Sequence, residues 1–205
     1  FAPKREVVFL EQPNGKPFTG FRGVGKSWAT VFTLLPGDLV PIIGEFKHGE
    51  EVISLVPPSG VPHKTEMSIP DVLLRMQTCG AREFEEETGL RLESIEPLCG
   101  PEGSPVSSRQ LKNQRCYPFL GRVAGPIIPG PSKLDATEHL KLVLIPLTEW
   151  LDLIDRGEVY EDCAKSTTLV ALRKLGRLEL VPSFETAGTG IHEAAATGDI
   201  SDQHL

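Results

Sequence analysis

The sequence has little of what a membrane protein, a disulfide-bonded protein or a nucleic-acid binder requires. Its 205 residues contain no apolar run close to the roughly 20 residues of a membrane-spanning helix. The four cysteines are widely spaced and lack a paired ligand pattern, which favours reduced thiols in a cytoplasmic protein. The 21 Lys and Arg residues are outnumbered by 28 Asp and Glu, and the formal charge of −7 argues against general nucleic-acid binding. We therefore expect neither a membrane nor a nucleic-acid partner.

One short motif suggests nucleotide binding, but the segments before and after it do not fit a phosphate-binding loop. Residues 20–27, GFRGVGKS, match the phosphate-binding loop pattern of Gly, four residues, Gly, Lys and Ser. That loop requires a buried strand before it and a helix that begins at the Lys-Ser pair. The preceding residues are polar and rich in turn formers, and the following WATVFTLLPG is typical of a strand. We therefore expect a turn that leads into a strand, with no phosphate on Lys26.

Strand-like and helix-like segments are mixed along the chain without strict alternation, which indicates an α+β fold. Strands are expected at 7–10, 28–35, 39–46, 51–56, 91–98, 117–123 and 140–146, with 28–35 and 39–46 joined as a hairpin. Helices are expected at 69–88, 148–156 and 165–175, and Pro70 suits the first turn of the longest. We divide the chain into an N-terminal strand and turn region (1–27), a main domain (28–181) and a polar tail (182–205).

The end of the longest expected helix concentrates negative charge. In AREFEEETGL, residues 81–90, Glu83, Glu86 and Glu87 are three or four residues apart and share one side of a helix. Like charges at these spacings repel, and Gly89 places them in the last turn, where the helix dipole is already negative. Clustered carboxylates bind hard divalent ions such as Mg²⁺ or Mn²⁺. From these residues alone, a metal site and a solvated acidic helix end are equally good interpretations.

The same stretch resembles the second half of the Nudix box, with every defined position filled from Arg82 to Leu90. GVPHKTE resembles the first half, with Gly60 and Glu66 in place. Fifteen residues, 67–81, separate the halves where the family has seven, and about two helical turns could accommodate the eight extra residues. Segments 40–60 and 138–175 are similar to the ADP-ribose and ADP-sugar pyrophosphatases of this family. The resemblance implies a Nudix-type α/β/α sandwich with a mixed sheet and a short N-terminal strand region.

The resemblance also implies roles for residues of the box and its neighbourhood. Metal ligands would be Glu83, Glu86, Glu87 and the backbone carbonyl of Ser59, which suits a hard ion. Arg82 would orient Glu83, and Glu66 would pair with Arg82. The residues expected to act in catalysis are therefore Glu66, Arg82, Glu87 and one further carboxylate outside the box.

That further carboxylate assists the attacking water in the family, and two acids lie in the right region. We assign the role, and a metal contact, to Glu138 rather than Asp135, because Glu138 is anchored at the start of a strand. Substrate binding is expected from Lys47, which stands where the subgroup usually has Arg. Arg109 and Arg115 belong to a basic loop that is equally well interpreted as a solvated surface.

The activity implied by the resemblance is hydrolysis of a nucleoside diphosphate linked to a second moiety, with Mg²⁺ as cofactor and Mn²⁺ as a substitute. The leading substrate is ADP-ribose, cleaved to AMP and ribose 5-phosphate, by a homodimer. Another nucleotide sugar or a dinucleotide is the first alternative, and a non-catalytic nucleotide-binding domain is the second. Trp28 is expected in the core, and His48 and His63 are expected to be ordinary surface residues.

Overall fold

The fold is known from a computed structural model, which describes residues 5–12, 14–47, 51–105, 111–112, 114–123, 125, 127, 129–130 and 140–178. Four residues named above, His48, Arg109, Asp135 and Glu138, lie outside the described residues, as does the expected tail over 182–205. Among the described residues, no helix has the length and apolar character needed to cross a bilayer.

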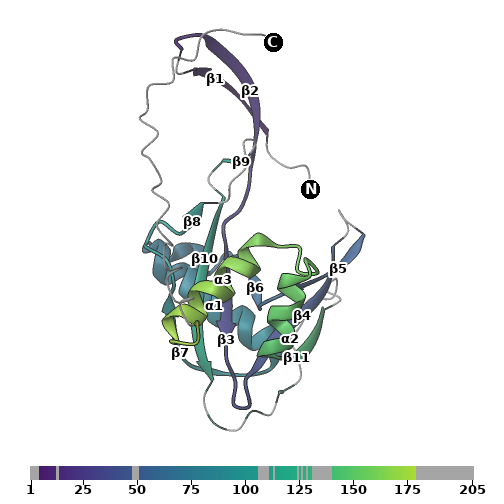
Figure 1. Cartoon of the computed structure of the whole chain (residues 1–205). Coiled ribbons are helices and arrows are strands. Elements are labelled where there is room, and N and C mark those ends of the chain that lie inside the picture. Colours follow the sequence, from purple (N-terminus) through teal and green to yellow (C-terminus); the bar gives the residue numbers. More distant parts are fainter. Residues whose placement is uncertain are drawn as a thin grey trace, which may run out of the picture.

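The described strands form three sheets (Figure 1). The N-terminal sheet contains β1 (Arg5–Glu11), β2 (Pro17–Val24) and β9 (Leu111–Lys112). The central sheet has the order β6 (Ser59–Gly60), β3 (Trp28–Thr33), β10 (Arg115–Val123) and β7 (Leu92–Pro97), and β8 (Ser104–Pro105) also pairs with β10. The third sheet has the order β11 (Leu140–Pro146), β4 (Leu39–Lys47) and β5 (Val52–Val56).

Helices cover both faces of the central sheet, which is mixed because β10 runs parallel to β3 and antiparallel to β7. The helical elements are η1 (Glu66–Ser68), α1 (Val72–Thr88), α2 (Leu147–Asp155) and α3 (Asp162–Lys174). Val31 of β3 packs in one core cluster with Phe84 of α1, whereas its neighbour Phe32 packs in another with Trp150 and Leu172 of α2 and α3. Successive side chains of a strand point to opposite faces, so α1 lies on one side and α3 on the other. The expected α/β/α arrangement is confirmed.

Helix α1 begins and ends at clear signals. The Asp71 carboxylate accepts a hydrogen bond from the Leu74 N–H (2.9 Å), so Asp71 is the N-cap. Pro70 therefore precedes the helix, and the expectation that it lies in the first turn was wrong. Gly89 ends the helix with φ +66°, as expected from its position. A Cβ there would lie 2.3 Å from the Gly130 carbonyl oxygen, so both backbone and space require glycine.

The phosphate-loop pattern does not form a phosphate loop. Residues 20–24 belong to β2, and β3 begins at Trp28, so no helix starts at Lys26 and Ser27. The expected turn was wrong for residues 20–24, because β2 is held in strand conformation by antiparallel pairing with β1. Its exposed location explains why turn formers are tolerated there. The boundary at residue 27 between an N-terminal region and a main domain stays a prediction.

The expected hairpin of 28–35 and 39–46 was also wrong. The turn after β3 is tight, with an isolated bridge between Leu35 and Leu39. Beyond that bridge the two strands separate, because β3 pairs with β10 and β6 while β4 pairs with β11 and β5. The far ends of the two strands therefore leave space between them.

Candidate functional site

A cavity of about 600 Å³ occupies this space between the central and third sheets. It is lined by the ends of β3, β4 and β6, by α1 and by the residues just before β10 and α3: Trp28, Glu45, Lys47, Ser59, Gly60, Val61, His63, Glu83, Glu86, Gln114 and Glu161. Four of these residues are acidic and one is a lysine. The cavity therefore attracts cations, and it suits an anionic ligand only if positive charge accompanies it.

Arg82 is the centre of the charged groups on α1. Its Nε donates to Glu66 Oε1 (2.9 Å), its Nη2 to Glu83 Oε1 (2.9 Å) and its Nη1 to Glu86 Oε2 (2.6 Å). Burial alone lowers the pKa of Arg82, but these three carboxylates outweigh it and raise the pKa, so the guanidinium is permanently charged. The expected contacts of Arg82 with Glu66 and Glu83 are present. Their catalytic role stays a prediction.

Glu66 reaches Arg82 despite the eight extra residues between them. The extra segment is taken up by η1 and the beginning of α1, and the Arg75 side chain fixes this connection by donating twice to the Ile69 carbonyl (3.0 and 2.7 Å). Glu66 itself is buried and accepts a further bond from the His63 N–H (2.7 Å). The insertion therefore leaves the two halves of the Nudix-like motif in contact.

Glu87 points to a different partner. Its buried carboxylate accepts a hydrogen bond from the Ser59 N–H (3.0 Å) and thereby joins α1 to β6. Ser59, Gly60, Glu83 and Glu86 line the cavity, and Glu87 is linked to that lining through Ser59. The thiol of Cys79 donates to the Gly60 carbonyl (3.5 Å), and burial, followed by the fields of Glu83 and Glu66, raises its pKa to about 12. Cys79 is therefore a neutral thiol at physiological pH.

The donor chemistry of this group fits a hard divalent cation. Glu83, Glu86, Glu87 and the Ser59 carbonyl offer only oxygen, the ligand that Mg²⁺ and Mn²⁺ prefer. Three carboxylates, those of Glu66, Glu83 and Glu86, contact a single guanidinium, and the Glu87 carboxylate adds a further negative charge on the same helix, so positive charge is in deficit. No three His, Cys, Asp or Glu side chains among the described residues converge as a metal site. The reason is that Glu83 and Glu86 both point to Arg82.

Lys47 lies on another wall of the cavity. Its Nζ contacts Glu45 Oε2 and lies 3.3 Å from Glu161 Oε1, so it bridges the end of β4 and the start of α3. Burial alone lowers the pKa of Lys47, but its bonds and attraction to Glu45 and Glu161 outweigh this and raise the pKa. Lys47 is therefore a fixed cation inside the cavity, at the position where a substrate contact was expected.

Of the two further cations expected to bind substrate, Arg109 lies outside the described residues and Arg115 does not line the cavity. Its backbone N–H donates to Ser27 Oγ (3.1 Å), and the preceding residue, Gln114, faces the cavity instead. The expectation that Trp28 belongs to the core was wrong, because β3 begins at this residue and its half-buried ring lines the cavity. His63, expected to be an ordinary surface residue, also lines it.

Sequence reasoning missed Glu45, Gln114 and Glu161. For Glu45 a signal existed, because it lies two residues before Lys47 on one strand and therefore shares its face. Gln114 and Glu161 carry no comparable signal. They precede β10 and α3 and meet the cavity only through the tertiary fold.

No protein-family model matches the chain, and no curated protein matches it either. A solved structure does: a protein whose structure is titled as that of an ADP compounds hydrolase has a TM-score of 0.63 to this chain, with 20% sequence identity. The match covers 85% of this chain and 88% of that chain. At this identity the likeness establishes the fold, which is an α+β Nudix-like fold with a mixed sheet between helices.

Proposed function

We propose that the protein hydrolyses nucleoside diphosphates linked to a second moiety, in a reaction that depends on Mg²⁺ or Mn²⁺. ADP-ribose, cleaved to AMP and ribose 5-phosphate, is the leading substrate. One observation carries the proposal: Gly60, Glu83 and Glu86, which come from both halves of the Nudix-like motif, line one wall of one cavity, and Arg82 joins Glu83 and Glu86 to Glu66. The fold shared with an ADP compounds hydrolase supports the same reaction class.

In this proposal Glu83, Glu86, Glu87 and the Ser59 carbonyl would hold the metal. The ion would neutralise the pyrophosphate and lower the pKa of a bound water. Arg82 and Glu66 fix the direction of the Glu83 carboxylate through the bonds described above. Glu138, outside the described residues, would accept the proton of the attacking water.

Lys47 would bind a phosphate of the substrate. Its ammonium group is the one cationic side chain among the described cavity-lining residues, and Glu45 and Glu161 hold it in place. Another nucleotide sugar or a dinucleotide presents the same diphosphate, so Lys47 serves either alternative equally. A non-catalytic nucleotide sensor is disfavoured because all the box carboxylates are retained.

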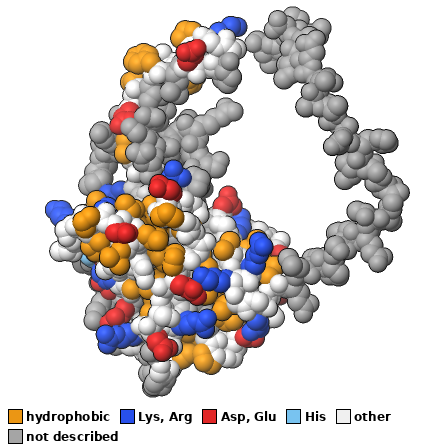
Figure 2. All heavy atoms as spheres, turned by 90° about the vertical axis from the view of Figure 1, so that its left-hand side faces the viewer, with side chains coloured by type: hydrophobic (Ala, Val, Ile, Leu, Met, Phe, Trp, Pro, Cys, Tyr) orange, Lys and Arg blue, Asp and Glu red, His pale blue; other side chains and the backbone are white. Residues whose placement is uncertain are grey.

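A second copy of the chain is the partner that we propose. The hairpin of β1 and β2 stands away from the body (Figures 1 and 2) and exposes apolar side chains: Val7 (54%), Phe9 (80%) and Phe18 (47%). A two-stranded hairpin is only marginally stable alone, so cover by a second hairpin would stabilise it.

The four cysteines are all free, which suits the reducing cytoplasm.

The proposed function is tested by release of phosphate monoesters from a panel: ADP-ribose, ADP-glucose, a diadenosine polyphosphate and ADP as a control. We expect turnover of ADP-ribose with Mg²⁺ or Mn²⁺, abolished by EDTA and by Glu83→Gln. Absence of turnover across the panel with either metal would contradict the proposal. Binding of ADP-ribose without turnover would favour the sensor instead.

A further inference from the structure

One residue of the phosphate-loop pattern at residues 20–27, Gly25, lies next to a residue that lines the cavity. The segments that precede β3 and β10 run side by side, because these strands are parallel and Cys116 pairs with Trp28. The hydrogen bond from the Arg115 N–H to Ser27 Oγ ties the two segments together. As a result, Gly25 of one segment lies against Gln114 of the other.

Gly25 provides the space in which the Gln114 side chain rests. A Cβ on residue 25 would lie 2.8 Å from Gln114 Cδ and 3.1 Å from its Cβ and Cγ. The Gly25 backbone is not in the left-handed region, so its conformation would accept another residue. Glycine is therefore required here for its missing side chain, and an alanine would push the Gln114 side chain away.

Gln114 lines the cavity beside Trp28, but its amide oxygen is not satisfied. Oε1 is buried and accepts no hydrogen bond from the part of the chain that the structure describes. A carboxamide oxygen has two acceptor sites, and an enclosed acceptor without a partner is unfavourable. Rotation of the flexible side chain away from Gly25 would bring the oxygen to any donor that enters the cavity.

We propose that Gln114 is a specificity-determining residue, which leaves Gly25 and accepts a hydrogen bond from a donor group of the bound substrate beside Trp28. The inference rests on the proposed function, since it takes the ligand to be a nucleoside diphosphate linked to a sugar. ADP-ribose offers donors on the adenine amino group and on both riboses, and the inference concerns the two that vary most among such substrates: the amino group of adenine and the hydroxyl groups of the distal ribose. A site built around such a bond rejects analogues that lack the donor.

The test compares kcat and KM for three substrates: ADP-ribose, IDP-ribose (which lacks the amino group) and the tetrahydrofurfuryl ester of ADP (which lacks the distal hydroxyls). We expect the wild type to prefer ADP-ribose at least tenfold in kcat/KM over one analogue, mainly through KM. Gln114→Met keeps the side-chain length without the acceptor and should reduce that preference to about twofold. Loss against IDP-ribose would identify the adenine amino group, and loss against the ester would identify the ribose.

Gly25→Ala supplies a second measurement that leaves Gln114 itself intact. It should change the KM for ADP-ribose at least threefold in the wild type but not in the Gln114→Met background, with melting temperatures confirming folded proteins. If Gln114→Met keeps both preferences, or Gly25→Ala acts equally in both backgrounds, the inference is wrong while the proposed function stands. If the wild type hydrolyses none of the three with Mg²⁺ or Mn²⁺, the inference is wrong, and the proposed function fails with it only if ADP-glucose and the diadenosine polyphosphate are not hydrolysed either.

Discussion

Gly60 and Glu83 lie so close together that no side chain fits between them. A Cβ on residue 60 would be 2.1 Å from both Cδ and Oε1 of Glu83. Gly60, from the first half of the Nudix-like motif, is the last residue of β6. It must be glycine because the Glu83 carboxylate, from the second half, lies directly over it. Two motif positions 23 residues apart in sequence are explained by one contact.

Gly60→Ala should therefore displace the Glu83 carboxylate. We expect kcat to fall about a hundredfold, because a displacement of about 1 Å of a catalytic group has effects of this size. The melting temperature should change little, since Glu83 lines the cavity and its carboxylate can rotate into that space. Gly100→Ala, at a glycine with open space around it, is the matched control and should behave as the wild type. Equal activity of the two variants would remove Glu83 from the reaction.

Glu87→Gln should remove the charge of residue 87 and keep its hydrogen bond to Ser59. The glutamine oxygen can still accept the hydrogen bond from the Ser59 N–H, so folding is retained. Removing a negative charge from the end of α1 also relieves repulsion, and the metal-free protein should melt at the same or a higher temperature. We expect turnover to fall by orders of magnitude. A sharp drop in melting temperature would instead make Glu87 a structural residue.

Lys47 and Lys26 offer a matched pair of lysine substitutions. Lys47→Met removes the charge from the cavity and should raise the KM for ADP-ribose at least tenfold. Lys26→Ala alters the phosphate-loop pattern, which forms no such loop, and turnover should stay within a few-fold of the wild type. A thousandfold loss in Lys26→Ala, about 4 kcal/mol of barrier, would restore a phosphate-binding role to residues 20–27.

The Glu66–Arg82 pair should make stability depend on acid pH. Burial alone raises the pKa of Glu66, but the bonds from Arg82 and the His63 N–H outweigh it, and the pKa lies below the ordinary 4.5. The carboxylate therefore stabilises the fold fully above pH 4.5, and this contribution disappears as pH falls through the lowered pKa. In melting curves from pH 7 to pH 3, Glu66→Gln should lose less stability than the wild type. Glu93→Gln, at an exposed position on β7, should follow the wild-type profile.

Glu138 and Asp135 can be ranked by paired substitutions. Glu138→Gln should lower kcat by about a hundredfold, as expected for loss of a general base, and Asp135→Asn by less than tenfold. Both variants should keep the wild-type melting temperature. The reverse order of the two effects would transfer the role to Asp135.

The sequence predicted those parts of the site that lie on one helix. Glu83 and Glu86 share Arg82 and the cavity as their spacing predicted, whereas Glu87 turns to the Ser59 N–H. Gly89 correctly predicted the end of α1. The expected Glu66 contact with Arg82 is present because η1 and the start of α1 absorb the extra residues.

Parts that depend on strand pairing could not be predicted in the same way. The local sequence predicts that β3 and β4 are strands. Nothing in it indicates that β10 and β11 are their partners. Trp28 was expected in the core because an aromatic residue at the start of a strand suits a core and a cavity wall equally well. Only the pairing of the strands decides between the two. Gln114 is brought to Gly25 only by the parallel pairing of β10 with β3.

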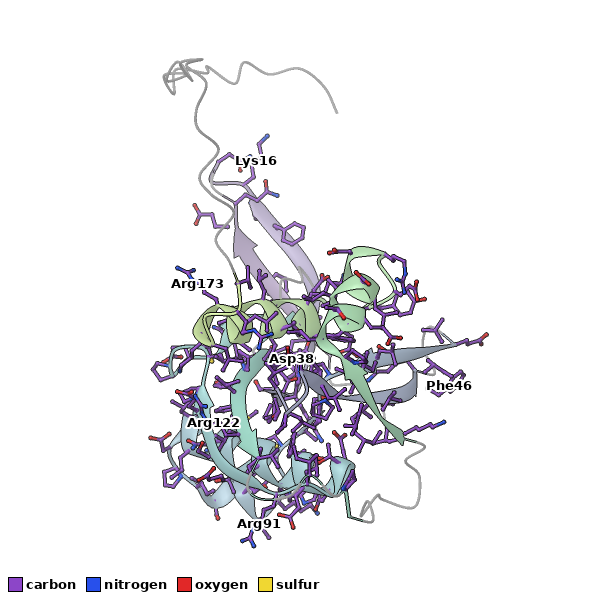
Figure 3. All side chains as sticks on the ribbon, turned by 60° about the horizontal axis from the view of Figure 1, so that its bottom comes forward. Lys16, Asp38, Phe46, Arg91, Arg122 and Arg173 are labelled. Carbon is purple, nitrogen blue, oxygen red and sulfur yellow. The ribbon has the colours of Figure 1, made fainter. Side chains whose placement is uncertain are left out.

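The cavity between β3 and β4 depends on the distant turn that joins these two strands. Trp28 begins β3 and Lys47 ends β4, and both strands meet at residues 36–38, roughly 25–30 Å away by strand rise (Figure 1). Figure 3 shows Asp38, which has φ +55°, and Arg177 clamps its carboxylate with two bonds (2.9 and 2.7 Å). These bonds tie the turn between the two strands to the segment that follows α3. Substitutions at the surface pair Asp38 and Arg177 would therefore act on the turn that joins two walls of the cavity without altering any residue that lines it.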